Sequence, residues 1–180
     1  MLLHMYFYAN EGEPVFVFDI DGVLVDVEAK LREVFRQLGL ERLKASPDLL
    51  DHNLRRKFWK LFLSKEFMVF DRPRRIGIEL LLSRLEMGGV VVITGRPQHL
   101  RGATIRELKA FGIPVERVFF LFRPKGDYRK DYVLKADFLS RLSNVIEVHD
   151  DSIEVLMEAR KIHPHAKLYL HKGNGYELVD

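Results

Sequence analysis

The chain has no cysteine among its 180 residues. Disulfide bonds, zinc–thiolate centres and thiol catalysis are therefore excluded. No basic leader followed by an apolar core opens the chain, and no apolar run is long enough to span a bilayer. We therefore expect a cytoplasmic protein that does not engage a membrane.

A phosphate-binding loop of the form GxxxxGK[S/T] is also missing, which excludes that mode of ATP binding. The chain is 47% hydrophobic and 31% charged, which suits one soluble domain, or one domain with a modest insert. Its formal net charge of +3 is compatible with a phosphorylated or nucleic-acid partner but does not require one.

One stretch near the N-terminus organises the rest of the chain. The apolar run Val15–Phe18 leads directly into Asp19 and Asp21, and Gly22 follows. Such a run suits a buried central strand of a parallel sheet, and the carboxyl end of that strand is where open α/β sheets bind ligands. If the strand continues, both carboxylates point the same way, and their repulsion favours a hard divalent cation between them. The alternative is a turn that happens to use aspartate and glycine.

The remaining chain alternates between strand and helix patterns. Apolar strand-like stretches lie at residues 15–19, 90–93, 118–122, 145–148 and 166–170, with amphipathic helical patterns between them and a Gly-rich tail after the last. This alternation predicts an α/β fold with a parallel sheet and right-handed crossovers. Residues 1–9 are apolar and aromatic and suit either an edge strand or a poorly ordered end.

The segment between the first two strands has a helical pattern. Gly39 is placed as a C-cap, and Ser46 with Pro47 is typical of a helix start. Cations gather beside Trp59, at Arg55, Arg56, Lys57, Lys60 and Lys65. They indicate either a basic, aromatic face over a phosphate site or the solvated face of an ordinary amphipathic helix, which is the commoner case.

Polar residues of particular kinds follow the other strands. Thr94, Gly95 and Arg96 follow the second, Asp150 and Asp151 follow the fourth. Cations follow the third strand and continue onto the next helix, at Arg123, Lys125, Arg129, Lys130 and Lys135. Because these strand ends share one edge of a parallel sheet, the set predicts a site for a magnesium ion and a phosphate group.

Four of these segments resemble the four motifs of the haloacid dehalogenase superfamily of aspartate-nucleophile phosphatases. They are Phe18–Leu24, Ile93–Arg96, Lys135 and Val148–Asp151, and the resemblance extends over about residues 15–170. It implies a Rossmann-like three-layer sandwich with a parallel central sheet of strand order 5-4-1-2-3. It also implies a core domain of residues 1–26 and 76–180, with residues 27–75 forming a small helical cap over the site.

The resemblance implies a role for each motif residue. Asp19 would attack phosphorus and form an aspartyl-phosphate, while Asp21 would protonate the leaving alcohol and then activate water. Thr94 and the N–H of Gly95 would hold phosphate oxygens, and Lys135 would neutralise charge on Asp19 and the transferred group. Aspartate at position 21 favours a phosphatase over the transport ATPases, which have threonine there, and over the dehalogenases, which lack this acid.

The same resemblance implies a Mg²⁺ site. Its ligands would be Asp19, Asp150, Asp151 and the backbone carbonyl of Asp21. His149 precedes Asp150, so strand alternation should turn its ring away from the metal, and we interpret it as a structural residue.

A closer resemblance covers Arg123–Lys135. The 3′-phosphatase domain of polynucleotide kinase/phosphatase proteins has a very similar run, which implies that Arg123 contacts the substrate phosphate, that Asp131 orients the loop, and that Arg96 also faces the substrate. Lys30 stands near an arginine of that family, although the helical pattern could aim it elsewhere. The alternative for the loop is a merely basic surface turn.

The leading hypothesis is thus a Mg²⁺-dependent phosphomonoester hydrolase acting on nucleic-acid or nucleotide phosphates, with 3′-phosphate ends favoured. One alternative is the same chemistry on a small phosphorylated metabolite. Another is a non-catalytic, basic nucleic-acid-binding module, against which the paired carboxylates count.

Overall fold

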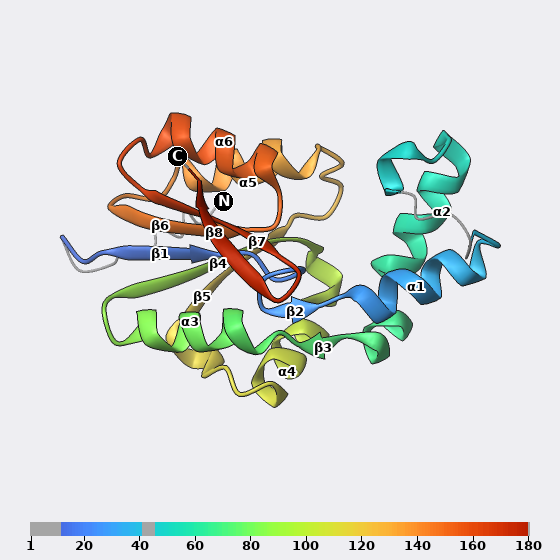
Figure 1. Ribbon diagram of the computed structural model, residues 1–180, viewed down its shortest axis with the longest axis horizontal. Coiled ribbons are helices and arrows are strands. Elements are labelled where there is room, and N and C mark those ends of the chain that lie inside the picture. Colours follow the sequence, from blue (N-terminus) through green and yellow to red (C-terminus); the bar gives the residue numbers. More distant parts are fainter. Residues whose placement is uncertain (1–11, 41–45, 180) are drawn as a thin grey trace.

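The computed structural model describes residues 12–40 and 46–179, and the expectation for residues 1–9 lies outside this part of the chain. A six-stranded sheet has the order β5-β4-β1-β6-β7-β8 (Figure 1). Its strands are β1 (Val15–Phe18), β4 (Gly89–Pro97), β5 (Val118–Arg123), β6 (Val145–Asp150), β7 (Lys167–Lys172) and β8 (Gly175–Val179). The five strands before β8 are parallel. Counted in chain order they lie 5-4-1-2-3 from β7 to β5, so the expected α/β sandwich and strand order are confirmed.

Four helices cover the two faces of the sheet (Figure 1). One face carries α3 (Arg75–Leu85) and α4 (Arg101–Ala110), and the other carries α5 (Asp131–Leu139) and α6 (Ile153–Ile162). The alternating side chains of β1 explain this arrangement, since Phe16 and Phe18 enter the first core while Val15 and Val17 enter the second. Each fully buried side chain of this kind contributes about 1.5–3 kcal/mol, so β1 stabilises both layers at once.

The chain after β7 forms a further strand where a Gly-rich tail was expected. Gly173 has a φ of +48° in the turn, and β8 then pairs antiparallel with β7, from Lys172 opposite Gly175 to Leu168 opposite Val179. The pattern did not reveal β8 because its middle residues are exposed and it buries no continuous apolar face.

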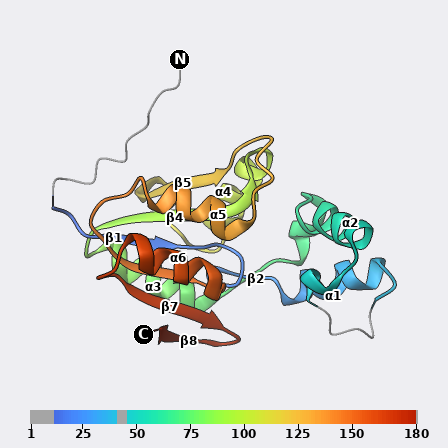
Figure 2. The same cartoon turned by 90° about the horizontal axis from the view of Figure 1, so that it is seen from above.

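The helical insert forms a lobe at one end of the molecule (Figures 1 and 2). It contains α1 (Glu28–Gln37), the short turns η1 (Pro47–Leu49) and η2 (Glu66–Phe70), and α2 (His52–Phe62). These elements share a small core of their own, whose buried residues are Val34, Leu50, Phe58, Phe62 and Phe67. Gly39, with a φ of +72°, ends α1 as expected, while Ser46 caps η1 and Asp51 caps α2.

A two-stranded ribbon joins this lobe to the sheet. β2 (Val25–Asp26) leaves the core and β3 (Arg72–Pro73) returns, and the two pair antiparallel. Both connections between the lobe and the core therefore lie next to the turn that follows β1. No helix within residues 12–40 and 46–179 has the length and apolar character needed to cross a membrane.

Two helical glycines provide a test of how closely α3 packs on the turn after β1. A Cβ at Gly77 would lie 1.8 Å from the carbonyl oxygen of Val23, whereas a Cβ at Gly102 meets only the end of the Arg106 side chain at 3.5 Å. Gly77→Ala should lower the free energy of unfolding by about 3 kcal/mol, because backbone must move to relieve the clash. Gly102→Ala should raise it by about 0.5–1 kcal/mol. Urea unfolding measures the free energy of unfolding of both variants. The same change in both would show that α3 can shift freely.

Candidate active site

Three carboxylates meet at the carboxyl edge of the sheet. Asp19 follows β1 directly, Asp150 ends β6, and Asp151 comes next in the chain. Oxygens of all three lie within 4.8 Å of one another, and the side chains of Asp19 and Asp150 are buried. Hard oxygen donors gathered this closely are the ligands that Mg²⁺ takes, so the residues fit the metal that the sequence predicts.

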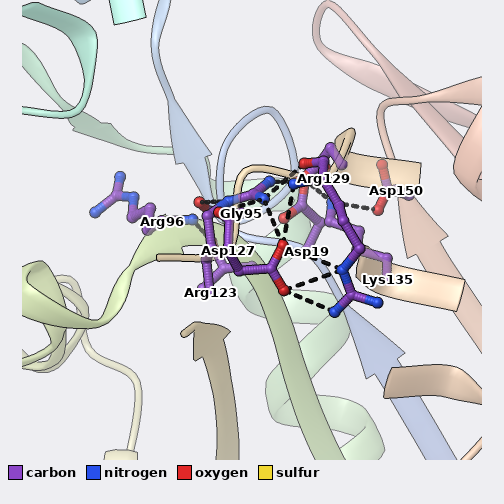
Figure 3. Close-up of polar contacts among 10 residues, drawn as sticks. Asp19, Gly95, Arg96, Arg123, Asp127, Arg129, Lys135 and Asp150 are labelled. Carbon is purple, nitrogen blue, oxygen red and sulfur yellow. Dashed lines mark hydrogen bonds and ion pairs between the residues drawn. The ribbon is translucent and has the colours of Figure 1, made fainter. Parts of the chain in front are cut away.

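A single ammonium group lies among these carboxylates. Lys135 Nζ, from the middle of α5, is 2.8 Å from Asp150 and 3.0 Å from Asp19 (Figure 3). The same Nζ is 3.0 Å from Asp131. Burial lowers the pKa of Lys135, but the surrounding carboxylates raise it well above its usual value, so the group stays charged.

One cation does not balance this many carboxylates. Burial raises the pKa of Asp19 well above its usual value, with Lys135 opposing this and Asp150 and Asp151 adding to it. Desolvation at the cluster and the neighbouring Asp150 likewise raise the pKa of Asp151, an otherwise exposed residue, to about 7. The excess of negative charge is the electrostatic condition under which a divalent cation binds.

Asp21 lies apart from this cluster. β1 ends at Phe18, so the condition under which Asp19 and Asp21 would point the same way is not met, and the chain turns instead through Gly22 with a φ of +83°. The Asp21 carboxylate bonds to Arg96 rather than to Lys135. Burial raises the pKa of Asp21, but Arg96 and Lys30 outweigh it and the pKa lies below its usual value.

Arg96 is placed differently from the sequence expectation. Its side chain is 2% exposed and points away from Asp19 and Lys135 in Figure 3, whereas a contact with substrate was expected. Its guanidinium donates to Asp21, Asp71, Glu107 and Thr104. The difference arises because a protein carboxylate, that of Asp21, occupies the face that an anionic substrate would need.

The other phosphate-binding candidates line the end of β4. Thr94 Oγ1 accepts the N–H of Arg96 at 3.1 Å, which leaves the hydroxyl proton available to a phosphate oxygen. A Cβ at Gly95 would lie 2.2 Å from Asp131 Oδ1, so a side chain there would displace the Asp131 carboxylate from its contacts with Arg123 and Lys135.

Arg123 organises the loop between β5 and α5. Its guanidinium donates to the carbonyl of Gly95 at 3.1 Å, to the carbonyls of Asp127 and Arg129 at 3.3 and 2.7 Å, and to Asp131 at 3.2 Å (Figure 3). Asp131 in turn bonds to Lys135. The geometry thus fits the expected loop-orienting role of Asp131. Most of the hydrogen bonds that Arg123 donates go to the loop itself.

Three charges near Asp21, the buried Lys30 and Asp71 and the partly buried Glu107, were not assigned to the site from the sequence. The sequence places Lys30 only near an arginine of the resembling family, and it gives no role to Asp71 or Glu107. Asp71 follows a short apolar turn, and Glu107 adjoins the buried positions Thr104 and Leu108 of α4. A carboxylate next to an apolar helical stripe is the one signal that could have found Glu107.

The histidine next to the metal cluster is structural in its contacts. His149 stacks on Phe18, with ring centroids 4.3 Å apart, and bonds to Glu147 and His171. Burial lowers the pKa of His149, which favours its neutral form. Its ring thus packs against the core on the face of the sheet that carries Phe18, as strand alternation predicts.

Comparisons with known proteins agree with this fold. No family model matches the chain, and no curated protein matches it in sequence. Among solved structures, a haloacid dehalogenase-like hydrolase from Streptococcus pneumoniae superposes with a TM-score of 0.62 at 12% identity, covering 88% of this chain and 84% of that one. A superfamily hydrolase from Geobacter sulfurreducens gives 0.53 at 14% identity, with 87% of each chain covered.

A further similar structure is a chain of the Pnkp1/Rnl/Hen1 complex. Its TM-score is 0.59 at 19% identity, and the match covers 92% of this chain. This chain spans about half the length of that one, 48%. The central sheet, the strand order and these superpositions together show that the chain has the fold of the haloacid dehalogenase-superfamily hydrolases.

Proposed function

We propose that the chain is a Mg²⁺-dependent phosphomonoester hydrolase that forms an aspartyl-phosphate on Asp19. The observation that carries this proposal is the position of Lys135, whose ammonium group bonds to Asp19, Asp150 and Asp131 at the edge of a three-carboxylate cluster. A nucleophilic carboxylate, a metal-binding pair and a charge-neutralising lysine are thereby assembled in one place.

The metal would be held by Asp19, Asp150, Asp151 and the backbone carbonyl of Asp21. When bound, Mg²⁺ supplies positive charge that keeps Asp19 ionised and screens it from an incoming phosphate. Gly22 is needed for this arrangement, because a Cβ there would lie 2.3 Å from Asp151 Oδ2.

The first half of the reaction transfers the phosphoryl group. A carboxylate oxygen of Asp19 bonds to phosphorus while the bond from phosphorus to the ester oxygen breaks. Arg96 favours the ionised form of Asp21 in the substrate-free protein, whereas the negative charge of a bound phosphate favours the protonated form that this step requires. Asp21 then gives its proton to the ester oxygen. Thr94 and the Gly95 N–H hold the other phosphate oxygens, and Lys135 balances the developing charge.

The second half releases phosphate. Asp21, now ionised, takes a proton from a water molecule whose oxygen bonds to phosphorus, and the bond from phosphorus to Asp19 breaks. The products are an alcohol and inorganic phosphate, and Asp19 and Asp21 return to their starting states.

A nucleic-acid or nucleotide substrate, with 3′-phosphate ends favoured, is supported by the β5–α5 loop. Arg123 holds this loop in place, and its tip presents Tyr128, 95% exposed, between the exposed cations Lys125 and Lys130. Exposed aromatic rings beside cations suit nucleobases and phosphates. A chain of the Pnkp1/Rnl/Hen1 RNA repair complex is also similar to this chain, with a TM-score of 0.58 at 18% identity.

A small metabolite remains the second candidate, and a different feature favours it. A cleft of about 910 Å³ between the cap and the core runs from Asp151 to Trp59. Its other charged lining residues are Asp48, Glu154, Glu177 and Lys172, so carboxylates outnumber cations. Such walls repel a polyanion and accept a small, uncharged leaving group.

The substrate experiment compares phosphate release from a 3′-phosphorylated oligonucleotide, a 5′-phosphorylated one, mononucleotides and sugar phosphates, each with and without Mg²⁺. We expect the fastest Mg²⁺-dependent release from the 3′-phosphorylated oligonucleotide, with an apparent affinity that falls as salt rises. Activity on sugar phosphates alone would favour the metabolite candidate. No turnover of any monoester would contradict the proposed hydrolase.

Asp19→Asn should abolish the covalent intermediate. We expect turnover to fall by about 10⁴-fold or more, because an amide does not attack phosphorus. Rapid-quench trapping of ³²P-labelled protein measures the intermediate. Glu158→Gln, which breaks an ion pair with Lys161 on the outer side of α6, is the matched control and should leave turnover unchanged. Labelled protein in the Asp19→Asn variant would assign the nucleophile elsewhere.

Metal affinity should depend on pH because of Asp151. Its pKa, raised to about 7 in the metal-free protein, means that protons compete with Mg²⁺ below that pH. Because the pKa of this carboxyl group in the folded protein is raised from 3.8, the free energy of unfolding falls as pH rises from 3.8 toward 7. Bound Mg²⁺ offsets this loss of stability. Calorimetry should therefore show weaker Mg²⁺ binding at pH 5.5 than at pH 8, and Mg²⁺ should raise Tm more at pH 8. A pH-independent affinity would contradict this assignment.

A further inference from the structure

We propose that Arg96 is a positioning residue for Asp21 and that the Lys30–Asp71 ion pair makes this position depend on the helical cap. This inference rests on the proposed function, in which Asp21 is the acid. It concerns a set of buried charges that the reaction itself does not use: Lys30, Asp71 and Arg96, which are 1%, 4% and 2% exposed.

Arg96 holds the Asp21 carboxylate in a defined orientation. Arg96 Nη2 lies 2.7 Å from Asp21 Oδ1, and Nε lies 3.2 Å from both carboxylate oxygens. A guanidinium that engages a carboxylate through two nitrogens fixes both distance and plane, which a lysine ammonium does not. The acid of the proposed reaction is thus held in place by a neighbour, not by the backbone alone.

The guanidinium is itself fixed on its other side. Nη1 donates to Glu107 at 2.7 Å and to Thr104 at 3.2 Å, and Nη2 also donates to Asp71 at 3.1 Å. Asp21 and Asp71 therefore share one nitrogen of Arg96. A shift of Asp71 changes the balance of hydrogen bonds at that nitrogen and hence the hold on Asp21.

Asp71 belongs to the segment through which the chain returns from the cap. It lies between η2 and β3, and Lys30 Nζ from α1 approaches its two oxygens at 2.8 and 3.0 Å. The same Nζ lies 4.4 Å from the centre of the Phe62 ring at the end of α2. A continuous path of buried contacts therefore runs from both cap helices through Lys30, Asp71 and Arg96 to Asp21.

Stability alone is a poor explanation for this path. Buried ion pairs lose so much hydration that apolar residues of similar size often stabilise a fold as well or better. The core has a second ion pair, between the partly buried Arg84 and the buried Glu147, with the neutral His149 beside it. Within residues 12–40 and 46–179, none of the hydrogen bonds of these three residues reaches Asp21. That second set provides a control for the cost of disturbing buried charge.

A misplaced acid has a characteristic kinetic signature. An alkyl alcohol leaves poorly without a proton, whereas p-nitrophenolate leaves without one. Weakening the hold on Asp21 should therefore slow hydrolysis of an alkyl phosphate much more than hydrolysis of p-nitrophenyl phosphate. General structural damage would slow both to a similar extent.

The experiment measures kcat and KM for a nucleoside 3′-phosphate and for p-nitrophenyl phosphate. Arg96→Met should lower kcat on the alkyl ester about 100-fold and on the nitrophenyl ester less than about 10-fold. Arg96→Lys should restore part of the difference. Lys30→Met leaves Asp71 to compete more strongly for Arg96, and it should show the same selective loss at about 10-fold.

Glu147→Gln is the matched control and should change both substrates by the same factor. Equal losses on both esters in Arg96→Met and Lys30→Met would overturn the inference, and Lys30→Met alone decides it if the Arg96 variants do not fold. Selective loss in Arg96→Met without any in Lys30→Met would overturn the link to the cap. If the unaltered chain hydrolyses no monoester, the proposed function fails; if it does so and the selectivity is unchanged, only this inference fails.

Discussion

The site depends on one buried ammonium group. Lys135 contacts Asp19, Asp131 and Asp150, which come from the end of β1, the start of α5 and the end of β6. Without that charge, the carboxylates would repel one another in a region from which water is largely excluded. Lys135 alone does not balance all the negative charge of these carboxylates. The remaining negative charge attracts a divalent cation.

The sheet makes this contact possible. β1 and β6 are neighbouring parallel strands, so Asp19 and Asp150 reach the same edge, and α5 packs against the face that directs Lys135 toward them. Arg96 provides the corresponding positive charge for Asp21 on the opposite side of the turn after β1. The two aspartates of one short motif therefore have separate counter-charges.

Much of this could be predicted from local sequence. The wholly apolar Val15–Phe18 indicated a central strand, and polar residues at successive strand ends had to meet at one edge. The orientation of Arg96 could not be predicted, because it depends on Asp71 and Glu107, which come from other parts of the chain. β8 was missed for a related reason: it is held by backbone pairing to β7, and its exposed side chains carry no apolar pattern.

The β2–β3 ribbon has an architectural consequence. Val25 pairs with Pro73 and Asp26 with Arg72, so the two ends of the inserted segment are separated by no more than the spacing of adjacent strands, about 5 Å. A segment whose ends meet can lengthen, shorten or be exchanged without pulling the sheet apart. The lobe is in effect an extended hairpin loop, and the core would tolerate a different lobe in its place, provided that the new one kept Asp71 and supplied a positive charge to it.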